Sequence, residues 1–160
     1  MSAVPPLPSP VELRWAWQLV GVHSGVVQTR ELPASPPCRA ATTARASSVL
    51  IACLARRLAA DQPPNAWATD LVGWMIRDVG GVVDPRSRIH HGIPLATGVL
   101  LASILGQDMP GWIDRHGSAT DRDLPAFLNV CWAVAYTLDA VHQRPGLADW
   151  TVRDLIAPAP

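Results

Sequence analysis

The sequence predicts an all-α fold, a single bundle-like domain of five to six helices. Four helix-length apolar segments are each bounded by Pro, Gly or a capping residue. The chain has 160 residues, the length of one domain, and hydrophobic residues make up 49% of it. We expect residues 9–156 to form the helical domain, residues 1–8 to be a flexible Pro-rich arm, and residues 157–160 to be a frayed tail.

The stretch 124–142 is expected to be the central helix. Asp123 is a suitable N-cap, and between residues 127 and 138 only Asn129 and Thr137 are clearly polar. A helix that is apolar on every side leaves no face suited to water. We therefore expect this helix to be buried all round, with Trp132 in the core at its middle.

The segment after the arm has two interpretations. Ser9 and Glu12 have the spacing of a capping box, with Pro10 at the first helical position, which favours a helix over about 10–22. The alternative is a short N-terminal β-hairpin within residues 11–32. It is indicated by alternating apolar residues before a Ser-Gly turn signal, Leu13, Trp15, Trp17 and Leu19 before Ser24-Gly25. The capping signal makes the helix our prediction.

The remaining elements follow from apolar periodicity and from breaker residues. A linker over 32–44 precedes a second helix over about 43–61, whose buried stripe is Val49, Leu50, Cys53, Leu54 and Leu58. Further helices are expected over about 66–79, 94–106 and 147–156, with a loop at 82–92 and a short segment at 110–115. Short connections predict that sequential helices pack roughly antiparallel.

Charge and cysteine usage limit the function classes. The formal net charge is +0, from 13 basic and 13 acidic residues, and every basic residue is Arg. Without a basic field, nucleic acid is a less favoured partner. The three Cys have no metal-ligand spacing, so we expect no metal or cofactor, and reduced thiols fit a cytoplasmic protein. The N-terminal segment lacks signal-peptide features, and the longest apolar run, 93–105, is too short to span a bilayer.

Low charge and abundant Trp predict an interaction surface. Only 16% of residues are charged, and the chain has seven Trp beside one Tyr and one Phe. Trp is favoured at interfaces because it combines large area with an N–H donor. The binding candidates are Trp15, Trp17, Trp112 and Trp150, with Arg88 and His90 as polar candidates. Our first hypothesis is a non-catalytic interaction or regulatory module that binds a protein partner or itself as a homo-oligomer.

The densest polar group lies between residues 84 and 91, where Arg86 and His91 form an R-x-x-x-x-H pattern. This pattern resembles the motif of HEPN-type ribonucleases, which are small helical domains that act as dimers. The resemblance covers six residues and implies that Arg86 holds the scissile phosphate while His91 acts in acid–base catalysis without a metal. Because Gly92 and Pro94 follow, we expect His91 to lie in a loop.

Two further alternatives rest on single helical faces. A DNA-binding regulator would direct Arg45, Arg56 and Arg57 of the second helix towards phosphate, although no clear helix-turn-helix pattern accompanies them. Asp139 and His142 are three residues apart on one helical face, but nothing has the H-E-x-x-H form of a metal site. We interpret this pair as the solvated end of the central helix, where His142 also suits the helix C-terminus.

Overall fold

The computed structural model describes residues 7–60, 88–107 and 120–157. Helix accounts for 76% of this part of the chain, and no strand occurs in it, which confirms the all-α class there. The helices are α1 (Pro10–His23), α2 (Ala40–Ala59), α4 (Arg88–Ile104), α6 (Leu124–His142) and α7 (Leu147–Ile156), with short 3-10 turns η1 (Thr29–Glu31) and η3 (Asp121–Asp123). The predictions for 66–79 and 110–115 lie outside the described residues.

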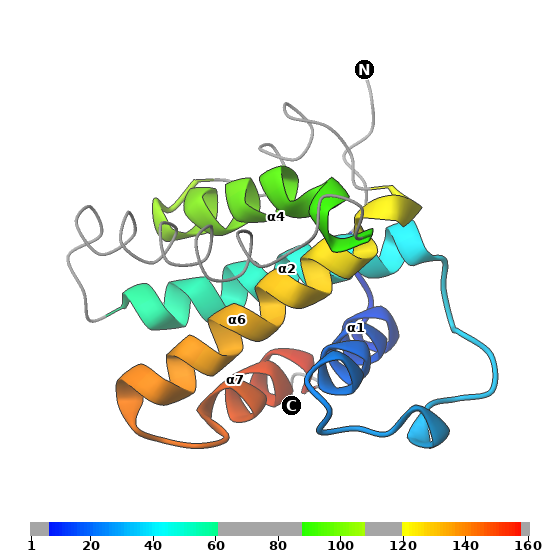
Figure 1. The fold of residues 1–160 in the computed structure, drawn as a ribbon. Coiled ribbons are helices and arrows are strands. Elements are labelled where there is room, and N and C mark those ends of the chain that lie inside the picture. Colours follow the sequence, from blue (N-terminus) through cyan, green and yellow to red (C-terminus); the bar gives the residue numbers. More distant parts are fainter. Residues whose placement is uncertain (1–6, 61–87, 108–119, 158–160) are drawn as a thin grey trace.

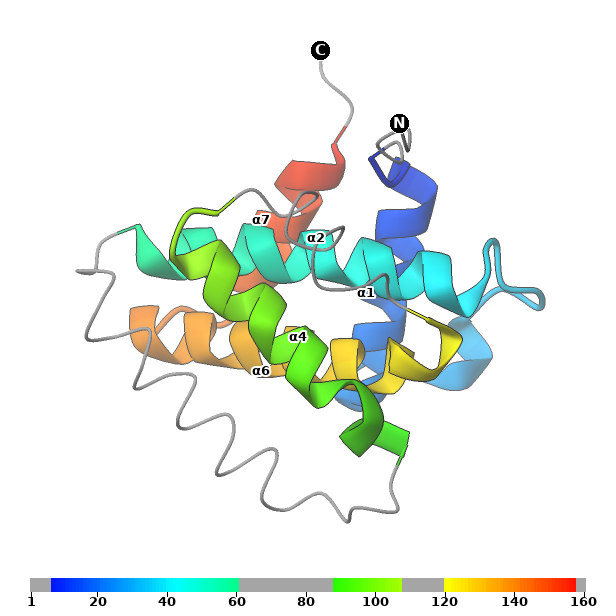
Figure 2. The same ribbon diagram turned by 90° about the horizontal axis from the view of Figure 1, so that it is seen from above.

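The helices are arranged in three layers (Figures 1 and 2). Helices α2 and α6 lie side by side in the middle layer. Helix α4 covers one face of this pair, and α1 and α7 together cover the opposite face. Helices α2, α4 and α6 all begin at the same end of the molecule, so these three are not antiparallel to one another.

The core lies between the middle layer and its two covers. Most of its fully buried large side chains come from α2, α4 and α6, namely Leu50, Ile51, Leu54, Leu58, Val99, Leu100, Phe127, Val130, Val134 and Leu138. Alanines of α2 allow neighbouring helices to approach closely, and its buried hydroxyls bond to their own helix, as Ser47 does to the carbonyl of Thr43 at 2.9 Å. Of the predicted stripe of α2, Leu50, Leu54 and Leu58 are buried, whereas Val49 and Cys53 are half-buried, and the buried face extends to further residues such as Ile51.

The N-terminal segment is a helix, and the hairpin alternative is wrong. The Ser9 hydroxyl accepts the N–H of Glu12 at 3.2 Å, and Pro10 occupies the first turn. The buried residues Leu13, Ala16 and Val20 recur at helical spacing. The alternation that suggested a strand placed Trp15 and Trp17 on one side. In the helix Trp15 is buried and Trp17 is half-buried.

Helix α4 begins six residues before the predicted start, so the predicted loop is wrong for residues 88–92. Pro94 lies inside the helix, where it removes a single backbone hydrogen bond without ending the element. A Cβ atom on Gly92 would lie 3.0 Å from the Cα of Asp123 and 3.0 Å from the Cβ of Ala126. The absence of a side chain at Gly92 therefore allows α4 to pack closely against η3 and α6.

Helix α6 has the predicted bounds but is not buried on all sides. Trp132 is half-buried, and Tyr136 and Val141 are exposed, which corrects the expectation that Trp132 lies in the core. Asp123 does not cap the helix with its side chain, since its carboxylate accepts the N–H and hydroxyl of Thr120 at 2.7 and 3.0 Å. Because Trp132 and Tyr136 are not fully buried, the side of α6 that carries them is open to solvent.

The segment Asp121–His142 is long and apolar enough to cross a membrane by length and composition alone. It is the one such helix in the described part of the chain, and half of its most apolar window is buried inside the protein. The core helix of a soluble protein passes the same test, so this is weak evidence for a span.

Candidate binding groove

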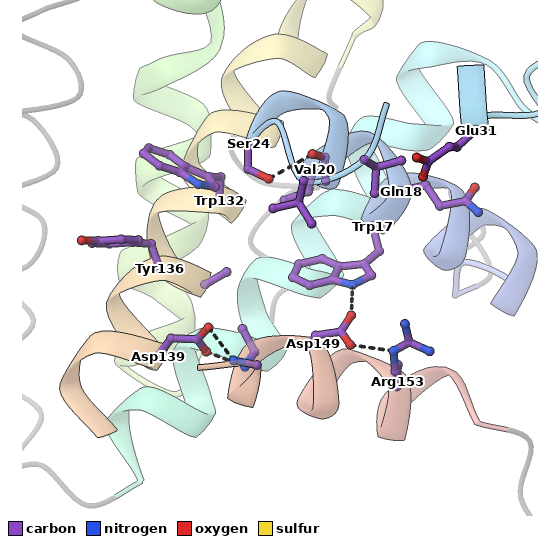
Figure 3. Close-up of a pocket in the computed structure, with 16 residues that line it drawn as sticks. Trp17, Gln18, Val20, Ser24, Glu31, Trp132, Tyr136, Asp139, Asp149 and Arg153 are labelled. Carbon is purple, nitrogen blue, oxygen red and sulfur yellow. Dashed lines mark hydrogen bonds and ion pairs between the residues drawn. The ribbon is translucent and has the colours of Figure 1, made fainter. Parts of the chain in front are cut away.

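A groove of about 660 Å³ opens between α1, the segment 24–31, α6 and the start of α7 (Figure 3). We call it the α1–α6–α7 groove. Three aromatic side chains line it, Trp17 from α1 and Trp132 and Tyr136 from α6. Its other apolar lining residues are Val20, Val26, Val27, Ala135 and Ala148, and its charged lining residues are Glu31, Asp139, Asp149 and Arg153. The volume lies within the range of ligand-binding pockets.

One wall of the groove is held by Asp149, which joins α1 to α7. The indole N–H of Trp17 donates to Asp149 Oδ1 at 2.9 Å. The other carboxylate oxygen accepts from Arg153 Nε at 2.6 Å within α7. Figure 3 shows the indole of Trp17 with its N–H directed at Asp149, whose carboxylate is held in turn by Arg153.

Asp139 of α6 lines the groove and also caps α7. Its Oδ2 accepts the N–H of Gly146 at 3.0 Å, and its Oδ1 accepts the N–H of Ala148 at 2.8 Å. These N–H groups belong to the N-cap residue and the first turn of α7, where backbone N–H groups have no partners within the helix. Asp139 is therefore the structural link between α6 and α7, and its negative charge lies at the positive end of α7.

The third wall is the segment that follows α1. The N–H groups of Val26 and Val27 both donate to the carbonyl of Gly21, at 2.9 and 3.0 Å. A Cβ atom on Gly21 would lie 2.7 Å from Val27 Cγ2. The absence of a side chain at Gly21 thus lets this segment fold back on α1 and place both valines in the groove.

The aromatic pair of α6 lies beside a polar contact between α6 and α1. Trp132 and Tyr136 have ring centroids 6.0 Å apart, and the ring of His23 meets Trp132 edge-on at 6.2 Å. His23 Nε2 lies 2.9 Å from Asn129 Oδ1. Asn129 is only 7% exposed, and its Nδ2 has no hydrogen-bond partner. The contact orients His23 against Trp132, whose ring lines the groove.

The sequence identified only one of the residues that line this groove as a binding candidate. Trp17 lines it, whereas Trp15 is 6% exposed and so is unavailable to a partner. Trp150 is 57% exposed on α7 but does not line the groove. Arg88, His90 and His91 lie in the first turns of α4, with side chains outside what the structure describes, and Arg86 and Trp112 lie outside the described residues altogether.

Sequence reasoning missed Tyr136, Asp139, Asp149 and Glu31 as lining residues. Trp132, Tyr136 and Asp139 have i, i+4 and i+7 spacing, which places them on one face of α6. That spacing was a usable signal, but the apolar character of the whole segment concealed it. Asp149 and Glu31 are in elements that only the tertiary fold brings to the groove.

Other reactive groups of the described residues do not form a site. Burial raises the pKa of the Cys131 thiol far above its ordinary value, and burial also raises the pKa of Cys53, so both remain protonated thiols near neutral pH. Among the residues that the structure describes, no group of three or more His, Cys, Asp or Glu could hold a metal ion.

Of the three arginines proposed to face DNA, Arg56 is exposed, while Arg45 and Arg57 are half-buried and engaged in contacts.

No protein-family model, curated protein or solved structure matches this chain.

Proposed function

We propose that this chain is a non-catalytic, cytoplasmic interaction module of bundle-like architecture that binds a protein partner in the α1–α6–α7 groove. The observation that carries the proposal is the lining of the groove by Trp17, Trp132 and Tyr136. Aromatic side chains concentrate binding energy at protein interfaces because they bury large areas at low entropic cost. The proposal requires no cofactor.

Two rim residues support an interface rather than a structural cleft. Val26 is 80% exposed and Tyr136 is 60% exposed, and both line the groove. Large side chains exposed around a concave apolar surface are typical of an interaction site. The low content of charged residues, 16% of the chain, is consistent with apolar surface that a partner covers.

The experiment is site-specific photo-crosslinking in cells that express the protein. Tyr136 is replaced by the photoreactive residue p-benzoylphenylalanine, and the matched control carries the same residue at Trp150, an exposed aromatic position outside the groove. We expect a discrete adduct from position 136, and mass spectrometry then identifies the protein or second copy attached. Adducts only from position 150 would show that the α7 surface predicted from the sequence is the interface.

Point variants separate binding from folding. Val26→Ser removes an apolar side chain at the rim of the groove. The control is Val141→Ser, the same substitution at an exposed valine of α6 that does not line the groove. Both should leave stability within about 0.5 kcal/mol of wild type, as ordinary surface substitutions do. Only Val26→Ser should reduce the yield of the adduct from position 136. Equal yields from the two variants would exclude the groove as the contact surface.

A second candidate is metal-independent ribonuclease activity through Arg86 and His91. The observation that favours it is that residues 88–92 begin α4, so His91 lies on a helix of the fold instead of a loop. The family that the motif resembles also carries it at the start of a core helix. RNA cleavage in the presence of a chelator, lost in His91→Ala while the thermal midpoint is unchanged, would establish this function. An inert wild-type protein would remove it.

A further inference from the structure

The α1–α6–α7 groove has an excess of negative charge, although the whole chain is formally neutral. Among the residues that the structure describes, three carboxylates line it, Glu31, Asp139 and Asp149, against one guanidinium, Arg153, so this part of the lining has a formal charge of −2. Arg153 is already paired with Asp149. The unbalanced charges are therefore those of Glu31 and Asp139.

These two carboxylates differ in how many further hydrogen bonds they can accept. Asp139 accepts one backbone N–H at each oxygen, and a carboxylate can accept about four hydrogen bonds in all. Glu31 is exposed, and its side chain makes no hydrogen bond or ion pair with any residue that the structure describes. Both can accept from a cation, and Glu31 has its full capacity available.

The aromatic end of the groove also suits a cation. Trp132 and Tyr136 lie with ring centroids 6.0 Å apart, and Asp139 follows on the same face of α6. A cation over an aromatic face is attracted by the ring quadrupole, and a carboxylate beside the rings adds a charged acceptor. Arginine fits such a surface better than lysine, because its planar guanidinium stacks on rings and can donate to a carboxylate at the same time.

The groove is extended rather than round. In Figure 3 the Trp132–Tyr136 pair and Asp139 lie on one side of the view and Glu31 lies on the other, with Trp17 and Val20 between them. A ligand that reaches both carboxylates must therefore cross the apolar middle of the groove. An extended peptide segment has this shape, with apolar side chains in the centre and a polar group at the end.

We infer that the groove takes an extended apolar peptide segment of the partner that places an arginine against Trp132, Tyr136 and Asp139. This inference rests on the proposed function and adds the chemistry of the bound segment. The central apolar residues of the segment contact Trp17, which is half-buried, and a second basic group of the segment pairs with Glu31. Charge complementarity identifies the occupant, since an acidic or neutral segment would leave the excess carboxylates unpaired.

The test is an NMR titration of the full chain, observed at the indole N–H signals of Trp17 and Trp132. The probes are acetyl-Leu-Leu-Leu-Arg-amide, which has its arginine at one end of an apolar segment, and the same peptide with citrulline, which keeps the shape of arginine without its charge. We expect the arginine peptide to bind about fivefold or more tightly than the citrulline peptide. We also expect its affinity to fall as salt is added, because these charges are near the surface.

Two variants assign the effect to the groove. Tyr136→Leu keeps an apolar side chain but removes the ring, and it should weaken the arginine peptide about two- to fivefold with no change for the citrulline peptide. Arg-peptide binding should be unchanged in Asp154→Asn, an exposed acid of α7 outside the groove.

Equal binding of the two peptides at these indoles would overturn the arginine inference while the interaction function stands. If neither peptide moves the indole signals at millimolar concentration, the inference is also wrong. Crosslinking from position 136 then decides separately whether the groove is an interface at all.

Discussion

The indole N–H of Trp17 donates to the carboxylate of Asp149 at 2.9 Å, across a separation of 132 residues. This bond joins the start of the fold to its last helix on the face opposite α4. The same carboxylate holds Arg153 at 2.6 Å. One acidic residue of α7 therefore links this helix to α1 and orients both the ring of Trp17 and the guanidinium of Arg153, which line the groove.

Trp17→Phe should destabilise the protein by about 0.5–1.5 kcal/mol, because it keeps most of the ring packing and removes one hydrogen bond. Urea denaturation gives the change in the free energy of unfolding. A double-mutant cycle with Asp149→Ala isolates the bond between the two residues. The matched control is Arg153→Met, which breaks only an exposed i, i+4 pair and should cost about 0.3–0.5 kcal/mol. A coupling of zero between Trp17 and Asp149 would contradict the contact.

Trp132 and Phe127 lie on the same helix but should respond very differently to truncation. Phe127 is fully buried, so Phe127→Ala should cost about 3–5 kcal/mol through lost burial and a cavity. Trp132 is half-buried at the groove, so Trp132→Ala should cost only about 1–2 kcal/mol. Chemical denaturation of both variants checks the order. A larger loss for Trp132 would mean that the groove is closed in solution.

Apolar periodicity and capping signals were sufficient to predict several elements of this fold. They located α6 and α7 at their observed bounds and α1 to within one residue. These helices have local signals, such as Ser9 before Pro10 and the Gly146 turn before α7. Helix α2 begins at Ala40, three residues before the predicted start, and the N–H of Ala41 in its first turn donates to a distant residue, Asp121, at Oδ1 and 2.8 Å. A cap supplied 80 residues away cannot be read locally.

The lining of the groove could not be predicted from the sequence for a related reason. Trp17 was recognised by type, but its partner Asp149 is fixed only by the packing of α7 on α1. The loop wall depends on Gly21, where the absence of a Cβ atom matters only because Val27 folds back on it. The expectation that α6 is buried all round assumed equal cover on every face, whereas its Trp132–Tyr136 face remains open to the groove.

Asp121 should stabilise the start of α2 although the two are distant in sequence. Asp121→Ala removes the acceptor of the Ala41 N–H and should cost about 0.5–2 kcal/mol, the usual effect of losing an N-cap. Hydrogen exchange should speed up at the first turn of α2 before it changes elsewhere. Asp121→Asn retains an acceptor and should recover most of the loss. A uniform change in exchange over the whole chain would contradict a local capping role.

Gly92→Ala should destabilise the protein even though alanine is the better helix former. The new Cβ would meet the Asp123 backbone and the Ala126 Cβ at 3.0 Å, and a backbone contact cannot rotate away. Overpacking costs about 1–3 kcal/mol, which outweighs a gain of about 1 kcal/mol in helix propensity. The thermal midpoint should fall, and it should fall further for Gly92→Val. A stabilised Gly92→Ala variant would show that α4 and η3 are less closely packed.

The buried thiols should make stability depend on pH in the alkaline range. Burial raises the pKa of Cys131, and to a lesser extent of Cys53, above the ordinary value of 9.0. The unfolded chain then releases these protons at a lower pH than the folded chain, so it binds fewer protons and is favoured as pH rises. Stability is thus fully present below about pH 9 and is lost above it, by up to about 1.4 kcal/mol per pH unit for the buried Cys131 thiol, while the partly exposed Cys53 thiol contributes less.

Cys131→Val provides the comparison, since it keeps an apolar side chain of similar size without an ionisable group. Urea denaturation under reducing conditions should give free energies of unfolding that decline less steeply above pH 9 for the variant than for wild type. Below that pH the two curves should run parallel, offset only by any difference in packing. Parallel curves throughout would mean that the Cys131 thiol ionises as readily in the folded protein as in the unfolded chain, and that α2 and α6 do not exclude water from it.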